Sequence, residues 1–186
     1  MTVVIFDVVV AILVMLYLSK VNKSANGMVK KYLIVPVILI WVHLVGNALQ
    51  ENNIGPEFLQ GHLHDLGVAA MWCMVVLRYF VHPSTTIPYY QKAVATANSV
   101  LKLTVPLHGV TTLLCIGYKV SQVTVFREEH IAKGYSGMLD VADIAALCVG
   151  FLVMVVNHYL LRGSVRRQMK GAIPKNDMFR LSSSDG

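Results

Sequence analysis

Several histidines and aspartates of this chain fall inside long apolar stretches, where ionisable side chains are rare. Five of them are the candidates for a site: His43, His64, His108, Asp65 and Asp143. Because such groups are costly in lipid, each points to a binding or proton-handling role or to a polar contact between helices. Imidazoles that converge from facing helices are common ligands of haem iron and of copper. These residue types therefore predict a haem or metal site built from several helices.

His43 belongs to a polar stripe in the second apolar stretch. It is followed by Gly46, Asn47 and Gln50, at spacings that line one face of a helix. A small residue beside polar ones is typical of a helix–helix interface in lipid. The stripe is compatible with ligation or proton handling by His43, and also with a hydrogen bond that only fastens two helices together.

His64 and Asp65 lie near the start of the third apolar stretch, close to its outer boundary. A histidine beside a carboxylate can be a metal ligand with its orienting partner. Adjacent residues on a helix diverge by about 100°, so we expect the two side chains to point toward different neighbours. His62, two residues earlier, is expected at the interface in contact with solvent.

His108 is the deepest titratable side chain, near the middle of the fourth apolar stretch. Pro106 precedes it and Gly109 follows it. We expect these two residues to interrupt the helix beside the imidazole and to make room for a bulky group. His108 is therefore the third ligand candidate, with His43 and His64.

Asp140 and Asp143 lie one turn apart at the outer start of the fifth apolar stretch. Together they could bind a cation, or pair with a basic side chain from the connection that precedes them. Negative side chains also stabilise a helix N-terminus, so capping is the simpler alternative. Asp143, the deeper of the two, joins Asp65 as a candidate metal ligand or orienting group.

The composition indicates that the solvent of this chain is mostly lipid. Of 186 residues, 55% are hydrophobic and 14% are charged, whereas a soluble domain carries about 25% charged residues. The net charge of +6 comes from basic residues that flank the apolar stretches. Flanking basic residues orient helices in a membrane, so we expect no nucleic-acid partner. The three cysteines are too scattered for a zinc pattern or a disulfide framework and are expected to pack as small apolar residues.

Five apolar stretches are long enough to cross a bilayer as helices, since each has close to the roughly 20 residues that span about 30 Å of hydrocarbon. The sequence therefore predicts an all-α, polytopic integral membrane protein: a bundle of five transmembrane helices in a single domain, residues 1–170. The first stretch is expected to be a retained helix rather than a cleaved signal peptide, and 171–186 a polar cytoplasmic tail. The expected spans are about 3–19, 32–50, 62–81, 99–119 and 138–161.

The distribution of Lys and Arg predicts an orientation. Basic residues are frequent in the first and third connections and in the tail, and absent from the second connection, 51–60. By the positive-inside rule, the N-terminus is outside and the C-terminus cytoplasmic. Pro83 and Pro88 mark the third connection as non-helical near its start. The fourth connection, about 120–137, could lie on the outer surface or cap the bundle. We expect the membrane to be a prokaryotic plasma membrane.

Residues 61–162 resemble the copper-resistance protein D (CopD) and HemJ-like group of small helical membrane proteins. The stretch HLHDLGVAAMWCMVVLRYFVHP resembles that group's helix with an early His, a Trp two turns on and an Arg-aromatic-His ending. The stretches LKLTVPLHGVTTLLCIG and YSGMLDVADIAALCVGFLVMVVNHYLLRG are similar to the two helices that follow.

This resemblance implies a bundle that handles copper or b-type haem, with His64 at the position of the family histidine. Two departures limit what it implies. HemJ-like enzymes carry a functional lysine on a later helix, where this chain has Asp140 and Asp143. The first two spans lie outside the resemblance, and the HemJ reaction is not part of what it implies for this chain.

The residues and the resemblance together predict a membrane subunit of a redox complex. It would bind b-type haem or copper in the outer half of its bundle, for electron transfer or metal supply. The ligand candidates are His43, His64 and His108, with Asp65 and Asp143 as further ligands or orienting groups. The expected partners are the lipid bilayer and other membrane subunits. We expect the chain itself to be a non-catalytic subunit of a membrane oxidoreductase.

Two other functions are compatible with the same residues. In one, the chain is a cofactor-free structural subunit of a larger complex, such as a membrane monooxygenase or oxidase, and its polar groups bond helices and subunits to one another. In the other, it is a small transporter or proton-translocating protein that uses Asp143 and His108. The sequence contains no nucleophile elbow or metalloprotease motif that would indicate a hydrolase.

Overall fold

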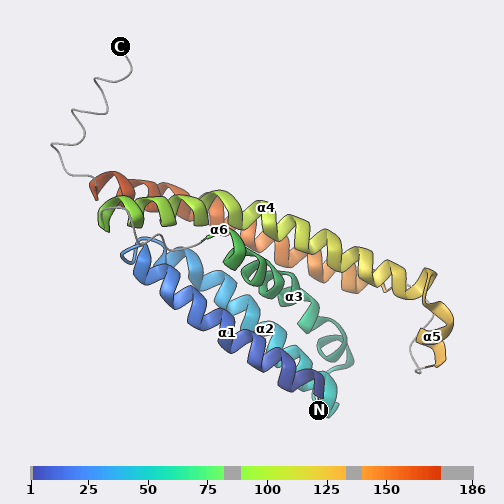
Figure 1. Ribbon diagram of the computed structural model, residues 1–186. Coiled ribbons are helices and arrows are strands. Elements are labelled where there is room, and N and C mark those ends of the chain that lie inside the picture. Colours follow the sequence, from blue (N-terminus) through green and yellow to red (C-terminus); the bar gives the residue numbers. More distant parts are fainter. Residues whose placement is uncertain (1, 82–88, 133–139, 173–186) are drawn as a thin grey trace.

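The computed structural model describes residues 2–81, 89–132 and 140–172 (Figure 1). These residues form helices joined by short connections, and no strand is present among them. The helices are α1 (Thr2–Ser24), α2 (Lys30–Asn52), α3 (Glu57–Phe80), α4 (Tyr89–Thr124), α5 (Arg127–Ala132) and α6 (Val141–Gly171). Within the described residues, five helices are long and apolar enough to cross a membrane. The prediction of an all-helical chain with five such helices is confirmed.

The helices extend well beyond the expected spans at several ends. α4 begins at Tyr89 rather than near residue 99 and ends at Thr124, and α6 continues to Gly171 rather than ending near residue 161. Apolarity marks only the part of a helix that contacts lipid, whereas the flanking segments are rich in Ala, Gln, Arg and Lys, which also favour helix. The short helix α5 occupies part of the expected fourth connection. Residues 133–139, which include the end of that connection, and the prolines of the third connection lie outside the described residues.

The predicted interruption of the helix beside His108 is wrong, because α4 continues through Pro106 and Gly109. Proline has no backbone N–H, so the carbonyl four residues earlier loses its helical hydrogen bond. A transmembrane helix tolerates proline where a neighbouring group donates to that carbonyl instead. α2 shows such a replacement at Pro36, which has no N–H for the carbonyl of Tyr32. The side chain of Asn157, on α6, donates to that carbonyl from Nδ2 at 3.0 Å.

α3 lies in the middle of the bundle, with α1 and α2 on one side and α4 and α6 on the other (Figure 1). On the α2 side, His43 is hydrogen-bonded to the carbonyl of His64. On the α4 side, Thr111 donates to the carbonyl of Ala69. Positions 64 and 69 lie on different sides of α3. Each residue of an α-helix is turned by about 100° about the helix axis, so two residues five positions apart point in directions that differ by roughly 140°. The two sides of α3 therefore form two separate interfaces.

Glycines allow the backbones at these interfaces to come into contact, as small residues commonly do between helices in lipid. A Cβ at any of the three positions would overlap the neighbouring backbone. Gly46 of α2 lies against the backbone of His64, Gly67 of α3 against the carbonyl of Leu39, and Gly150 of α6 against the carbonyl of Leu66.

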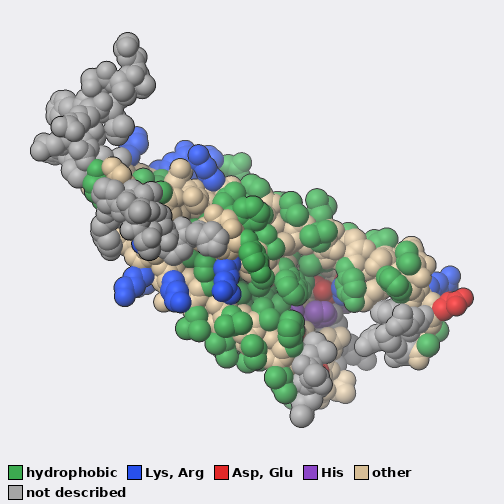
Figure 2. All heavy atoms as spheres, in the orientation of Figure 1, with side chains coloured by type: hydrophobic (Ala, Val, Ile, Leu, Met, Phe, Trp, Pro, Cys, Tyr) green, Lys and Arg blue, Asp and Glu red, His purple; other side chains and the backbone are tan. Residues whose placement is uncertain are grey.

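The outer surface is largely apolar, and large side chains such as Leu113 and Leu160 are 69% and 74% exposed. Figure 2 shows hydrophobic side chains over most of the visible face, with Lys and Arg gathered toward the end of the bundle at which α6 ends. Exposed apolar surface of this extent is compatible with lipid contact and with an integral membrane protein.

Candidate functional site

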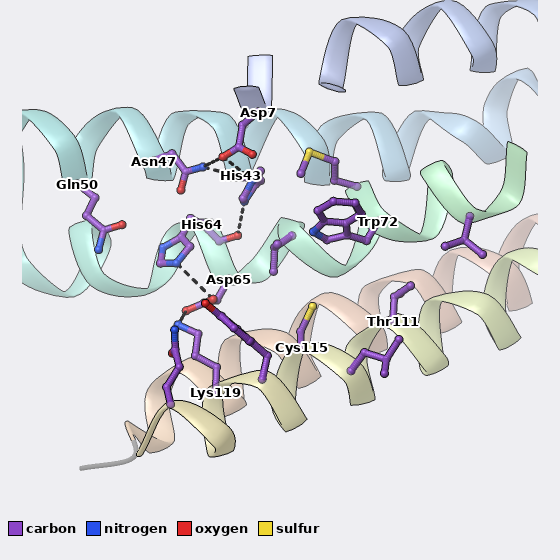
Figure 3. Close-up of a pocket in the computed structure, with 16 residues that line it drawn as sticks. Asp7, His43, Asn47, Gln50, His64, Asp65, Trp72, Thr111, Cys115 and Lys119 are labelled. Atoms are coloured by element: carbon purple, nitrogen blue, oxygen red, sulfur yellow. Dashed lines mark hydrogen bonds and ion pairs between the residues drawn. The ribbon is translucent and has the colours of Figure 1, made fainter. Parts of the chain in front are cut away.

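A pocket of about 650 Å³ opens between α1, α2 and α3 on one side and the C-terminal half of α4 on the other (Figure 3). Its polar lining includes Asp7, His43, His64, Asp65 and Lys119. Its apolar lining includes Val68, Met71, Trp72 and Leu114. In Figure 2, imidazole and carboxylate atoms are visible between apolar side chains. A concave, mostly apolar site with a few converging polar groups is the usual form of a small-ligand or metal pocket.

His43 is held in one orientation by two hydrogen bonds. Its Nδ1 lies 2.9 Å from the carbonyl of His64, and because a carbonyl only accepts, Nδ1 must carry the proton. Its Nε2 lies 3.3 Å from the amide nitrogen of Asn47, which donates. In this pair of hydrogen bonds Nε2 is the acceptor nitrogen, and it faces Asn47 at the edge of the pocket. An N–H donated to a carbonyl with the other nitrogen left as acceptor is the arrangement that orients metal-binding histidines.

Asp7 approaches the same ring from α1. Its carboxylate accepts a hydrogen bond of 2.6 Å from Asn47 and lies 3.5 Å from Nε2 of His43. The residue is 8% exposed although it carries a carboxylate. Sequence reasoning missed Asp7. The signal that could have found it is a lone carboxylate inside the first apolar stretch.

His64 brings a second imidazole to the pocket. Its ring centroid lies 6.4 Å from that of His43. Its Nε2 is 3.3 Å from Asp65, while its Nδ1 is buried and has no hydrogen-bond partner among the described residues. The expectation that His64 and Asp65 point to different neighbours holds in part. They contact each other, but His64 lies beside α2 whereas Asp65 extends to α4.

Asp65 begins a chain of ion pairs that joins α3, α4 and α6. Nζ of Lys119 donates to Asp65 at 3.1 Å and to Asp143 at 2.8 Å, so one ammonium bridges two carboxylates. Asp65 is only 2% exposed, and a buried carboxylate without such a partner would be costly. Asp143 does pair with a basic residue, as one alternative raised by the sequence expected, but that residue belongs to α4 and not to the connection before α6. Lys119 itself was missed as a site residue, because its position at the end of an apolar stretch is typical of an interfacial lysine.

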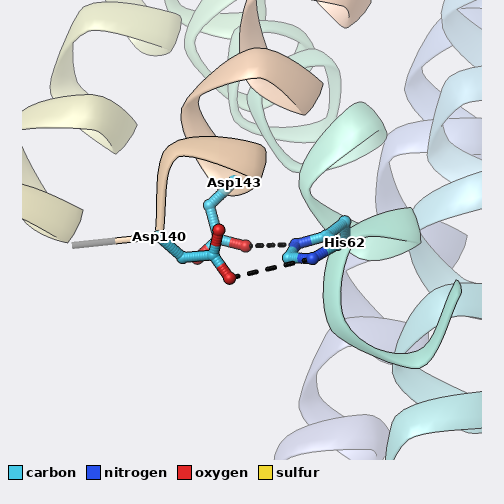
Figure 4. Close-up of side chains that lie close together, drawn as sticks. All are labelled: His62, Asp140 and Asp143. Carbon is cyan, nitrogen blue, oxygen red and sulfur yellow. Dashed lines mark hydrogen bonds and ion pairs between the residues drawn. The ribbon is translucent and has the colours of Figure 1, made fainter. Parts of the chain in front are cut away.

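At the N-terminal end of α6, His62 lies between the carboxylates of Asp140, the N-cap residue, and Asp143 (Figure 4). Its Nδ1 is 2.7 Å from Asp143 and its Nε2 is 3.7 Å from Asp140. One ligand atom from each of these three residues lies within 4.8 Å of the others. Asp140 also accepts a hydrogen bond from the backbone N–H of Ala142 at 2.8 Å, so the capping alternative is confirmed for it. The expectation that His62 is solvated is wrong, since its side chain is 15% exposed and bonded to Asp143.

His108 lies apart from the other two ligand candidates. It is fully buried, and neither ring nitrogen has a hydrogen-bond partner within the described part of the chain. Its ring is 5.8 Å from that of Phe151, on α6. Thr111, one turn along α4, contacts α3 on the side away from α2. The structure therefore brings His43, His64 and Asp65 together and connects them to Asp143 through Lys119, but it places His108 at the other interface.

The pocket offers a donor set suited to a soft or borderline metal. Two imidazole nitrogens of the pocket are acceptors. Nδ1 of His64 has no hydrogen-bond partner among the described residues, whereas Nε2 of His43 would have to give up its hydrogen bond from Asn47 to bind a metal. Met71 and Cys115, which also line the pocket, add a thioether and a thiol. Imidazole, thioether and thiol together are the ligands that copper prefers. A porphyrin has no space between the two rings, because α2 and α3 are in backbone contact at Gly46 and His43 is bonded to the backbone of His64 itself.

Comparisons of this chain with protein-family models, with curated proteins and with solved structures find no match.

Proposed function

We propose that this chain is a metal-handling subunit of a membrane redox complex, which binds copper in the outer half of its bundle. His43 and His64 are the proposed ligands, and the role is metal supply or electron transfer to partner subunits. The resemblance of residues 61–162 to the CopD and HemJ-like group points to the same histidine, His64. The N-terminus lies outside and the C-terminus in the cytoplasm, as the basic connections predict.

One observation carries the proposal. His43 donates from Nδ1 to the carbonyl of His64, so Nε2 is its acceptor nitrogen, and the two ring centroids lie 6.4 Å apart. On binding a metal, Nε2 would exchange its 3.3 Å hydrogen bond from Asn47 for the ion. A metal about 2.0 Å from each nitrogen can bridge two rings at about this separation only in a linear arrangement, with both acceptor nitrogens turned toward the ion. Fixing the tautomer and the ring plane in advance reduces the entropy lost when the metal binds.

Copper is favoured over b-type haem by the position of His108. A haem held by two histidines needs them on opposite sides of the macrocycle. His43 and His64 come from helices in backbone contact, and His108 lies at the interface of α3 with α4 and α6. A single copper ion needs no such width between the helices.

Copper binding by the purified chain tests the proposal. Equilibrium dialysis against Cu(I) buffered with a competing chelator should give a stoichiometric site in the unmodified chain. His43→Gln and His64→Gln should each weaken that site at least tenfold, the usual scale for loss of a metal ligand or its support. His158→Gln is the matched control, because His158 bonds to Tyr32 elsewhere in the bundle. Equal binding by all four proteins would reject the proposed ligands.

A cofactor-free structural subunit remains the second candidate, and a specific observation favours it. His43, Asn47 and Asp7 already satisfy one another across α1, α2 and α3. Interhelical hydrogen bonds of this kind hold bundles together without any ligand. On this alternative, His43→Gln would lower thermal stability in the absence of metal, and added copper would not raise the stability of the unmodified chain.

A further inference from the structure

A second groove, of about 310 Å³, lies between α4 and α6. Lys102, which lines it, precedes Lys119 of the first pocket by seventeen residues of α4, about 25 Å of helix. Arg162, which lines it from α6, follows the start of that helix by a similar distance, about 30 Å. Since this is close to the thickness of the hydrocarbon core, the groove lies at the opposite membrane surface from the pocket of His43.

Three cationic side chains line this groove: Lys102 from α4, and Arg162 and Arg166 from α6. The two arginines are one helical turn apart and therefore lie on the same face of α6. None of the described residues that line the groove is acidic, and no ion pair in the described part of the chain involves these three cations. The groove therefore concentrates positive charge without an internal counter-charge.

The position of Arg162 is partly fixed before any ligand binds. Its guanidinium carbon lies 4.5 Å from the centre of the Tyr159 ring, within range of a cation–π contact. Such a contact leaves the N–H groups of the guanidinium free to donate to an anion. A planar set of donors held in place is well suited to the oxygens of a phosphate.

The other part of the groove is apolar. Leu101, Val105 and Val155 line it beside the basic residues. A site for a free anion does not need such a surface, whereas a phospholipid presents a phosphate and an acyl chain side by side. The groove therefore combines positive charge with apolar surface at the level of the membrane where a phospholipid headgroup joins its acyl chains.

We propose that this groove binds an anionic phospholipid of the phosphatidylglycerol class. Lys102, Arg162 and Arg166 hold its phosphate, and one acyl chain lies along Leu101, Val105 and Val155. The site is independent of the copper proposal, because it shares no residue with the outer pocket. Its lipid also joins α4 to α6 at the end of the bundle where these helices extend beyond the hydrocarbon.

Lipid retention by the full chain tests this site. The protein is exchanged into mixed micelles with equal amounts of phosphatidylglycerol and phosphatidylcholine, and the retained lipids are counted by native mass spectrometry. We expect the unmodified chain to prefer phosphatidylglycerol. The double variant Arg162→Gln with Arg166→Gln should reduce that preference by roughly thirtyfold, because each basic side chain near an anionic headgroup contributes about fivefold and the two effects multiply. Lys30→Gln with Lys31→Gln is the matched control, since it removes the same charge outside the groove.

Three results would overturn the proposal. One is equal retention of the two lipids by the unmodified chain. Another is an equal loss of preference in the control variant, which would mean general surface charge rather than a site. The third is full displacement of phosphatidylglycerol by inorganic phosphate at the concentration of the headgroup, which would assign the groove to free phosphate. Both double variants should elute and unfold as the unmodified chain does, because the substituted residues are exposed.

Discussion

Gly46 lies against the backbone of His64 so closely that a Cβ at position 46 would overlap the amide nitrogen of His64. One turn earlier on α2, His43 donates to the carbonyl of the same residue. The contact of two backbones therefore determines where both imidazoles of the pocket lie. Gly46 binds nothing itself, but because it has no side chain it allows the close backbone contact that positions the proposed ligands.

Gly46→Ala should weaken both the fold and the site. The added methyl group forces α2 away from α3, at a cost of about 1–3 kcal/mol of stability for overpacking, and lengthens the bond between His43 and the carbonyl of His64. We expect a lower midpoint of thermal unfolding in detergent and weaker copper binding. Gly117→Ala is the control, because a Cβ there meets nothing within 4 Å. An unfolding midpoint for Gly46→Ala as high as that of Gly117→Ala would contradict the packing described.

Lys119→Met should destabilise the chain strongly. It leaves Asp65, at 2% exposure, as a buried carboxylate without its cation, and breaking such a pair costs about 3–5 kcal/mol. Adding Asp65→Asn removes the uncompensated charge, so the double variant should recover a large part of the loss. Urea unfolding of the two single variants and the double variant measures this coupling. Additive losses would show that the two residues do not interact.

Asn157→Leu tests how α2 tolerates Pro36. The substitution leaves the carbonyl of Tyr32 without its donor, because Pro36 cannot supply one. An unsatisfied buried carbonyl costs about 1–3 kcal/mol. Pro36→Ala in the same chain restores a backbone N–H at the helical position and should recover most of that loss. If Pro36→Ala gives no recovery in the Asn157→Leu background, the loss comes from packing rather than from the hydrogen bond.

The proposed orientation can be tested by labelling single cysteines in intact cells, with the native cysteines Cys73, Cys115 and Cys148 replaced by Ser. Ile54→Cys lies in the connection between α2 and α3, and its residue is 58% exposed. It should react with a maleimide that cannot cross membranes. Lys23→Cys, at the end of α1, should react only after the membrane is permeabilised. The reverse pattern would mean that the N-terminus is cytoplasmic.

The sequence predicted the existence and order of the five long helices because each contains an apolar stretch of about the length that crosses a bilayer. It underestimated α4, since the turns from Tyr89 to Asn98 are helical without being strongly apolar. Position along each helix was also predictable, and it placed His43 and His64 in the same region of the bundle, where their ring centroids lie 6.4 Å apart.

What hydropathy could not supply is the rotation of each helix about its axis. His108 is buried within the bundle, as expected for a third ligand candidate, but its ring packs against Phe151 of α6 and does not line the pocket. Lys119 bridges Asp65 and Asp143 because of the same rotation. These pairings depend on contacts between side chains of three helices, which no periodicity within one helix determines.

Metal content is the most direct test of the central claim. The chain is purified gently from its own membrane with any partner subunits, its copper and iron are measured, and a dithionite-reduced minus oxidised spectrum is recorded on the same sample. We expect copper equimolar with the chain, no b-type α-band that depends on this chain, and loss of the copper in the His43→Gln and His64→Gln variants. Equimolar iron with a b-type band that disappears on substitution of His43 would contradict the account, and so would a protein that contains neither metal.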